Sequence, residues 1–260
     1  MFHGRDYSAQ RRHSINAMIP TLVRDIVRGL GQIVYPPACL ACGQGIGDQP
    51  IALCDPCRER LIDEPHETCR RCASTIGPNL PPADDCPQCR DKPLAFDRVV
   101  RLGPYDGLRR EIILKIKHVK HEALAAAAAA AWVYSRMHCL RDLGIVAVVP
   151  APLHWRRQWM RGYNQAEALA EAWASGLGVA IRRRWLRRVR PTQRQTSLAP
   201  TARFENVRNA FAAGRDPRMI GATILFVDDV VTTGATASEA ARALKRAGAA
   251  RVIVAALGHG

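Results

Sequence analysis

The sequence is poor in acidic residues, in aromatic residues and in long hydrophobic runs. Its 260 residues include 23 Asp and Glu against 38 Lys and Arg, giving a net charge of +15, and 6% are aromatic. No segment approaches the roughly 20 apolar residues of a membrane-spanning helix, and no export signal is visible, so we expect a cytoplasmic protein without a membrane span. The excess of positive charge favours polyanionic or phosphorylated partners, although a general arginine bias would produce the same charge.

Eight of the nine cysteines form four C-x-x-C pairs. In a cytoplasmic chain such pairs hold metal more often than they form disulfides, and two pairs complete a tetrahedral zinc site. We pair them in sequence order as two structural zinc sites, with crossed pairing, a single occupied site or a redox role as alternatives. The ligands are Cys39, Cys42, Cys54 and Cys57 for the first site and Cys69, Cys72, Cys86 and Cys89 for the second.

Four segments of different composition follow one another. Residues 1–18 are polar and basic, which predicts a disordered tail; residues 19–35 predict an amphipathic helix that docks on the protein's own core or on a membrane surface. Residues 36–93 hold the cysteine pairs with little apolar material, which predicts a double zinc ribbon folded by metal. In residues 94–260, apolar strand patterns alternate with helical ones, which predicts an α/β fold with a mainly parallel sheet flanked by helices.

A candidate ligand site lies in the segment ILFVDDVVTTGAT, residues 224–236. Ligands of open α/β sheets bind at the carboxyl ends of strands, where Asp228 and Asp229 stand. Gly234 and the free N–H groups that open the following helix suit a phosphate. Adjacent carboxylates beside a phosphate repel it unless they bind hydroxyls or a cation, so a phosphorylated ribose with Mg²⁺ satisfies the site. An acidic strand end before an ordinary helix cap is the alternative.

This segment resembles the phosphoribosyl pyrophosphate (PRPP) motif of type I phosphoribosyltransferases. The strings VPAPL (149–153), RGYNQ (161–165) and RPTQRQTSL (190–198), behind four C-x-x-C pairs, resemble the ComF family (ComF/GntX-like). The resemblance implies a type I phosphoribosyltransferase fold behind a double zinc ribbon. It implies that Asp228 and Asp229 hold the ribose hydroxyls and that Arg161 faces the pyrophosphate. The other implied PRPP contacts are Val231, Thr232, Thr233, Gly234, Ala235, Thr236, Ala151 and Pro152.

A basic segment, RRRWLRRVRPTQR at residues 182–194, contains seven arginines and no acidic residue. Arginine pairs with phosphates and aromatic rings stack on unpaired bases, which predicts a track for single-stranded DNA. A solvated basic face with Trp185 in the core fits the composition equally well. The track residues are Arg182, Arg183, Arg184, Trp185, Arg187 and Arg188.

The resemblance also implies a link to natural competence, DNA uptake or DNA utilisation, with competence or recombination proteins as further partners. Two hypotheses follow. One is a phosphoribosyltransferase that displaces pyrophosphate from C1 of the ribose; the other is a non-catalytic protein that senses PRPP and binds single-stranded DNA. Fold alone does not decide between them. Lys117 falls where the family pattern has a lysine, and it is either a phosphate contact or a surface lysine.

Overall fold

The structure, a computed structural model, describes residues 37–47, 51–77, 86–153, 159, 162–192, 199 and 202–260. The chain divides into two compact units, Met1–Cys54 and Asp55–Gly260. The predicted tail, residues 1–18, and the predicted amphipathic helix, residues 19–35, lie outside the described residues. Within the described ranges, no helix has both the length and the apolar character that crossing a bilayer requires.

The first unit contains a cysteine knuckle closed by backbone hydrogen bonds. The N–H of Cys39 donates to the carbonyl of Gln44 at 2.7 Å, and the N–H of Gly43 donates back to the carbonyl of Cys39 at 2.8 Å. Gly43 has φ +80, a left-handed conformation that glycine adopts without a steric penalty. The turn therefore brings the two cysteines of the first C-x-x-C pair to one side of the backbone.

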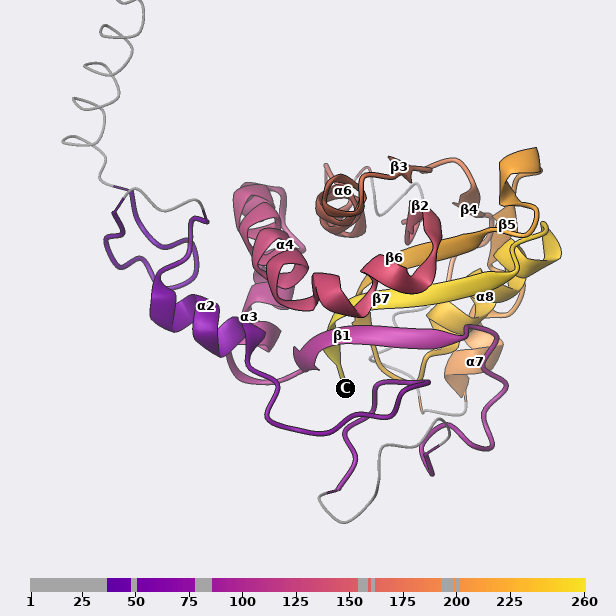
Figure 1. Cartoon of the computed structure of the whole chain (residues 1–260), viewed down its shortest axis with the longest axis horizontal. Helices are drawn as coiled ribbons and strands as arrows, with labels where there is room; N and C mark the ends of the chain where they lie inside the picture. Colours follow the sequence, from indigo (N-terminus) through magenta and orange to yellow (C-terminus); the bar gives the residue numbers. More distant parts are fainter. Residues whose placement is uncertain are drawn as a thin grey trace, which may run out of the picture. The chain divides into compact units, whose positions relative to one another are not determined.

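The second unit is built on a five-stranded parallel sheet (Figure 1). The strand order is β1-β7-β6-β2-β3, and each neighbouring pair is parallel. The strands are β1 (Arg98–Pro104), β2 (Ile145–Pro150), β3 (Ala180–Ile181), β6 (Thr223–Val231) and β7 (Arg251–His259). β6 and β7, in the middle, are apolar without alternation because both faces of the sheet are covered. The predicted α/β fold with a mainly parallel sheet is confirmed.

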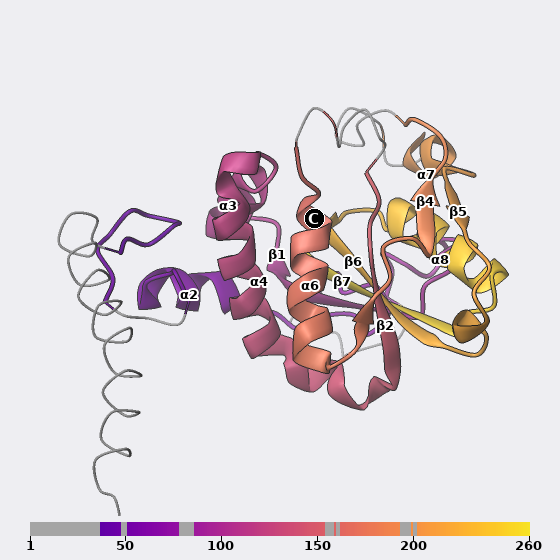
Figure 2. The same ribbon diagram turned by 90° about the horizontal axis from the view of Figure 1, so that it is seen from above.

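Helices cover both faces of this sheet (Figure 2). On one side lie α3 (Gly107–Lys115), α4 (Glu122–Arg136) and α6 (Gln165–Leu177), and on the other lies α8 (Ala235–Arg246). Five of the seven alanines in the run at residues 125–131 of α4 are buried, and the rings of Trp132 and Trp173 meet edge to face at 5.2 Å, which joins α4 to α6. The alanine-rich run is thus a packing surface.

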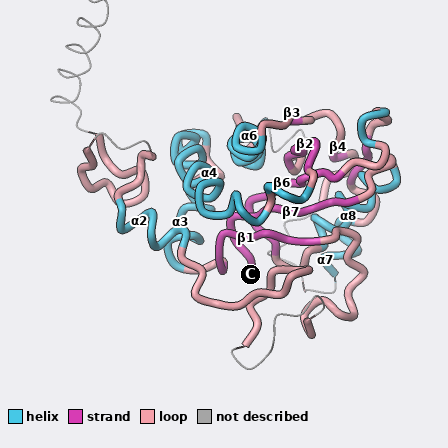
Figure 3. The backbone as a smooth tube through the Cα atoms, in the orientation of Figure 1, coloured by secondary structure: helices cyan, strands magenta, loops and turns pink. Residues whose placement is uncertain are grey.

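Smaller elements complete the unit (Figure 3). The short strands β4 (Leu186–Arg188) and β5 (Phe211–Ala213) form an antiparallel ladder on the side of α8. The sequence did not predict this ladder, because three residues are too few to show a period. The remaining elements are α2 (Asp55–Ile62), α7 (Ala202–Val207), η1 (Val119–His121), η2 (Met137–Cys139), η3 (Arg141–Leu143) and η5 (Pro217–Met219).

Part of the excess positive charge serves the fold. Arg109 is buried, and its Nη1 donates to the carbonyls of Arg60, Leu61 and Asp63 at 3.2, 3.1 and 2.6 Å. The first two carbonyls lie in the last turn of α2 and the third follows its end, so they have no partner within the helix. Arg136 donates to the last carbonyl of the same helix at 3.2 Å. These arginines cap α2, so their charge is not available to a polyanion.

Candidate functional site

The two predicted site carboxylates lie near the carboxyl end of β6. Oδ1 of Asp228 accepts a hydrogen bond from the N–H of Asp229 at 2.9 Å, and Oδ1 of Asp229 accepts one from the N–H of Val230 at 3.0 Å. These local bonds fix the orientation of both side chains. The second oxygen of Asp229 lies 3.5 Å from Nζ of Lys117, which follows α3. Lys117, for which the sequence allowed two interpretations, therefore stands at the site.

The charge of Asp228 is unfavourable in this setting. Burial raises the pKa of its carboxyl well above the usual range, and the neighbouring charge of Asp229 raises it further. The guanidinium of Arg188 opposes both effects. Arg188, predicted as part of the DNA track, therefore lies close enough to act on Asp228, and its guanidinium also stacks over the ring of Phe211 at 5.3 Å. A bound cation, or hydroxyl groups that donate to these carboxylates, would stabilise their ionised forms.

The turn between β6 and α8 has the features of an anion site. β6 ends at Val231, and Gly234 precedes the first residue of α8 with φ +77 and no side-chain cap. The first N–H groups of the helix, which have no carbonyl partner within it, point out of its amino end. The hydroxyl oxygen of Thr233 is buried, and among the described residues it has no hydrogen-bond partner. Buried polar groups are normally satisfied, so this hydroxyl can donate to or accept from a group bound at the turn.

The loop after β2 lies next to the carboxylates, because Pro150 of β2 pairs with Val227 of β6. The N–H of Ala151 donates to the carbonyl of Val227 at 2.8 Å. Asn164 donates from Nδ2 to the carbonyl of Ala151 at 3.1 Å, while its Oδ1 caps α6 by accepting from the N–H of Ala166 at 3.1 Å. One asparagine thus joins the loop to a helix start.

Of the other two residues predicted to contact PRPP from this loop, the structure describes one. Pro152 is half-buried beside Ala151. Arg161 lies outside the described residues. The structure therefore brings together Asp228, Asp229, the turn before α8 and the loop that starts at Ala151.

The predicted DNA track is only partly exposed. Trp185 is 6% exposed, and its indole N–H donates to Oδ2 of Asp216 at 2.9 Å. Arg182 stacks over the same ring, with its guanidinium carbon 5.7 Å from the centroid. In this conformation Trp185 presents no open face to a base. Its place agrees with the alternative of a core tryptophan under a basic face.

Among the other arginines of the track, environments differ. Arg183 forms ion pairs with Glu167 and Glu171 of α6. Arg184 and Arg187 are exposed. The predicted track therefore reduces to a few outward-facing guanidinium groups on either side of a buried tryptophan.

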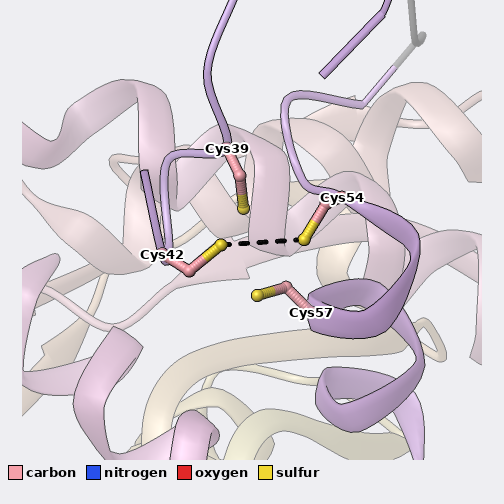
Figure 4. Close-up of side chains that lie close together, drawn as sticks. All are labelled: Cys39, Cys42, Cys54 and Cys57. Carbon is pink, nitrogen blue, oxygen red and sulfur yellow. Dashed lines mark hydrogen bonds between the residues drawn. The ribbon is translucent and has the colours of Figure 1, made fainter. Parts of the chain in front are cut away.

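The first cysteine cluster fits a tetrahedral metal (Figure 4). The sulfur atoms of Cys39, Cys42, Cys54 and Cys57 all lie within 4.8 Å of one another, and those of Cys42 and Cys54 are 3.7 Å apart. A tetrahedron with Zn–S bonds of ~2.3 Å has sulfur–sulfur edges of ~3.8 Å. Burial raises the pKa of Cys39, but the N–H groups of Cys54, Cys42 and Ala41 lower it more, to about 6. The thiolate that zinc requires is thus favoured.

The second cluster has the same geometry. The sulfur atoms of Cys69, Cys72, Cys86 and Cys89 are buried, and neighbouring pairs are 3.6 to 3.8 Å apart. Burial raises the pKa of Cys69, but backbone N–H groups lower it more, to about 7. Both clusters join cysteines in sequence order, as predicted, and their four-sulfur donor sets leave no open position, which suits structural zinc.

A small hollow, open to solvent, lies between this second cluster and the turn before α8. Sequence reasoning missed this proximity, because nothing in the spacing of the cysteines relates them to residues about 150 positions later. The lining includes Cys72, Cys89, Leu94, Phe96, Thr232, Thr233, Gly234 and His259.

Comparison with known proteins agrees with this architecture. Residues 30–91 match the double zinc ribbon domain, and residues 164–258 match the phosphoribosyl transferase domain. The chain is 31% identical over 226 residues to the DNA utilization protein YhgH of Salmonella typhi, covering 85% of this chain and 96% of the relative. It is 29% identical to the protein of the same name from Escherichia coli K12, with the same coverage. It is 27% identical over 223 residues to Competence protein F of Haemophilus influenzae, covering 83% and 94%.

The two domains occur in the order expected from the resemblance, and the relatives match over nearly their whole length. With its two cysteine clusters and its phosphoribosyltransferase domain, the chain belongs to the ComF family.

Proposed function

We propose that this protein binds PRPP together with Mg²⁺ at the carboxyl ends of β2 and β6. The observation that carries the proposal is the pair Asp228 and Asp229 near the end of β6, followed within one turn by the unsatisfied buried hydroxyl of Thr233. A ribose with two hydroxyls and a 5′-phosphate supplies the groups that these residues lack. A nucleic-acid phosphate alone would not explain the carboxylates.

In this proposal each part of the ligand has its own partners. Asp228 and Asp229 accept from the ribose hydroxyls, and residues 231–236 donate to the 5′-phosphate. The loop of Ala151 and Pro152, with Arg161, lies along the pyrophosphate. Bound Mg²⁺ supplies positive charge that stabilises the pyrophosphate leaving group. Lys117, beside Asp229, adds a mobile positive charge on the same side.

Calorimetric titration of the zinc-loaded chain with PRPP and Mg²⁺ tests the proposal. We expect saturable binding, and Asp229→Asn weakens it at least about tenfold, since a charge-assisted hydrogen bond contributes roughly 1.5–3 kcal/mol. Asp142→Asn, which alters an exposed carboxylate on η3, is the matched control and leaves the affinity unchanged. Absence of binding by the wild-type chain, or equal binding by Asp229→Asn, would overturn the proposal.

We further propose that the protein is a cytoplasmic component of DNA uptake or utilisation, working with competence or recombination proteins. The support is that its relatives are named DNA utilization protein and Competence protein F. Exposed Arg184 and Arg187 offer guanidinium groups to the phosphates of single-stranded DNA.

Two biochemical roles are consistent with PRPP binding. In a transferase, the bond from C1 to the pyrophosphate oxygen breaks, a bond from a nitrogen nucleophile to C1 forms, and the nucleophile loses a proton to solvent. In a sensor, PRPP binds intact and modulates DNA binding. Assay of pyrophosphate release with nucleobases and single-stranded DNA as acceptors separates the two. Release with one acceptor, abolished in Asp229→Asn, supports the transferase, and binding without release supports the sensor.

A further inference from the structure

A short segment connects the second cysteine cluster to the phosphate-binding turn. We call residues 92–97, which follow Cys89 closely, the strap. At one end the N–H of Lys92 donates to the carbonyl of Cys89 at 3.1 Å. At the other end the N–H of Asp97 donates to the carbonyl of Val252 in β7 at 3.0 Å. The strap is therefore held between the cluster and the central sheet.

The strap is bonded to α8 through one buried hydroxyl. Ser238, which is 1% exposed, donates from Oγ to the carbonyl of Pro93 at 2.9 Å and accepts from the N–H of Ala95 at 2.9 Å. Nη2 of Arg242 donates to the same carbonyl of Pro93 at 3.3 Å. Ser238 lies in the first turn of α8, next to the proposed phosphate site. One side chain thus fixes the helix start against the strap.

The strap also packs directly against the turn. A Cβ atom placed on Gly234 would stand 3.2 Å from Cδ2 of Leu94 and 3.2 Å from ring carbons of Phe96. Both side chains are buried. Gly234 therefore rests on these side chains, and a shift of the strap would displace the turn.

The cluster fixes the strap from a second direction. Arg71 lies between the ligands Cys69 and Cys72, and its Nη2 donates to the carbonyl of Leu94 at 3.3 Å. The carbonyl of Arg71 accepts from the N–H of Val99 in β1 at 2.9 Å. Residues within the second cluster thus contact both the strap and the strand that follows it.

From these contacts we propose that Ser238 and the strap position the phosphate-binding turn, so that occupancy of the second cysteine cluster sets the affinity for PRPP. The inference rests on the proposed function for its ligand and deepens it by adding a control site. Metal holds the cluster together, the cluster holds the strap, and the strap supports Gly234. Linkage is reciprocal, so bound PRPP retards metal loss from the second cluster.

The first test requires no ligand. Hydrogen–deuterium exchange is followed for a peptide covering residues 231–240 in the zinc-loaded full chain. Ser238→Ala retains all eight cysteines and every proposed phosphate contact, and we expect at least about fivefold faster exchange at the turn. Ser135→Ala is the matched control, because its hydroxyl donates to a carbonyl of its own helix α4, that of Trp132, at 3.1 Å. Unchanged exchange in Ser238→Ala overturns the positioning role.

The second test measures the linkage. We expect the Kd for PRPP to rise at least about fivefold in Ser238→Ala and to remain unchanged in Ser135→Ala. Saturating PRPP slows the release of one zinc per chain to a chelator in the wild type, and this protection is weaker in Ser238→Ala. Zinc release that is indifferent to PRPP, in a chain that binds PRPP, overturns the control by metal. If the wild type binds no PRPP, the proposed function fails, while the exchange experiment still decides the role of Ser238.

Discussion

Nζ of Lys117 lies 3.5 Å from Oδ2 of Asp229, so a lysine beyond the end of α3 balances a carboxylate at the end of β6. The pair is only partly exposed, with 29% of the lysine side chain and 14% of the aspartate side chain accessible. A charge in this position can turn from the carboxylate to an incoming anion. Lys117 is therefore a candidate contact for the pyrophosphate of PRPP.

Replacing this lysine should weaken PRPP selectively. For Lys117→Gln we expect the Kd for PRPP to rise roughly tenfold, as for removal of one charge-assisted hydrogen bond, and the Kd for ribose 5-phosphate to change less. Calorimetry with both ligands measures the difference. Lys120→Gln, at an exposed lysine on η1, is the control. Equal losses of affinity for the two ligands would mean that Lys117 acts only through Asp229.

The raised pKa of Asp228 predicts a pH-dependent stability. A carboxyl whose pKa is raised by folding binds its proton more tightly in the native state. Its contribution to stability is therefore complete below the unfolded value of ~3.9 and is lost as the pH rises through the raised native value. At pH 7.5 we expect Asp228→Asn to melt a few degrees higher than the wild type. Each kcal/mol gained in the free energy of unfolding raises the melting temperature by about 2–4 °C.

Thermal melts from pH 4 to pH 8 measure this effect. The gain from Asp228→Asn should shrink toward pH 4, where the wild-type carboxyl is protonated. Asp142→Asn should follow the wild-type curve throughout. A gain independent of pH would show that the charge of Asp228 is not its source.

Substitutions at two glycines, Gly178 and Gly234, distinguish the effect of backbone strain from the effect of contact with the strap. Gly178 ends α6 at φ +68, and a Cβ atom placed on it would meet nothing within 4 Å, whereas Gly234 at φ +77 faces Leu94 and Phe96. We expect Gly178→Ala to cost roughly 1–2 kcal/mol of stability for the left-handed backbone, without effect on PRPP. Gly234→Ala should cost more stability than Gly178→Ala and should also weaken the binding of PRPP. Equal costs in denaturant melts, with PRPP affinity intact in both, would contradict the tight contact.

Metal content tests the two clusters. We expect about two zinc per chain, since each Cys₄ set binds one ion. Cys42→Ser and Cys86→Ser should each retain about one. The ninth cysteine, Cys139, belongs to neither cluster, so Cys139→Ser should retain both ions. Elemental analysis after gel filtration measures the number of zinc ions per chain. A value near one for the wild type would mean that one of the two clusters does not bind zinc.

Salt dependence tests the exposed arginines. Doubly substituted Arg184→Ala/Arg187→Ala should bind single-stranded DNA more weakly. The slope of log K against log salt should fall by ~0.7 for each phosphate that the double variant no longer neutralises. Arg141→Ala, at an exposed arginine on η3, should match the wild type. An unchanged slope in the double variant would mean that Arg184 and Arg187 do not contact the phosphates of DNA.

The strands and helices of the second unit follow from local sequence. Apolar strand patterns alternating with helical ones in residues 94–260 predicted a parallel sheet with helices, and the structure has the apolar strands β2, β6 and β7 and the helices α4, α6 and α8. Element ends depend on caps and tertiary contacts, which periodicity does not report.

What the sequence did not reveal is non-local. A composition of arginine and tryptophan suggests stacking on bases, but Trp185 is buried and its indole N–H donates to Asp216, which lies in a different segment. Likewise, Ser238 occupies an ordinary helix position, and its bonds to residues 93 and 95 appear only when the chain is folded. The residues that would contact a ligand or a metal were visible as motifs, whereas the residues that hold them in position were not.

The position of β7 between β1 and β6 has a consequence for synthesis of the protein. β1 leaves the ribosome about 150 residues before the strand that pairs with it. At a translation rate of ~5–20 residues per second, the edge of β1 that pairs with β7 remains unpaired for on the order of 10–30 s. The site on β6 therefore acquires its neighbour on that side only late in translation, and the nascent chain depends in the meantime on protection from aggregation.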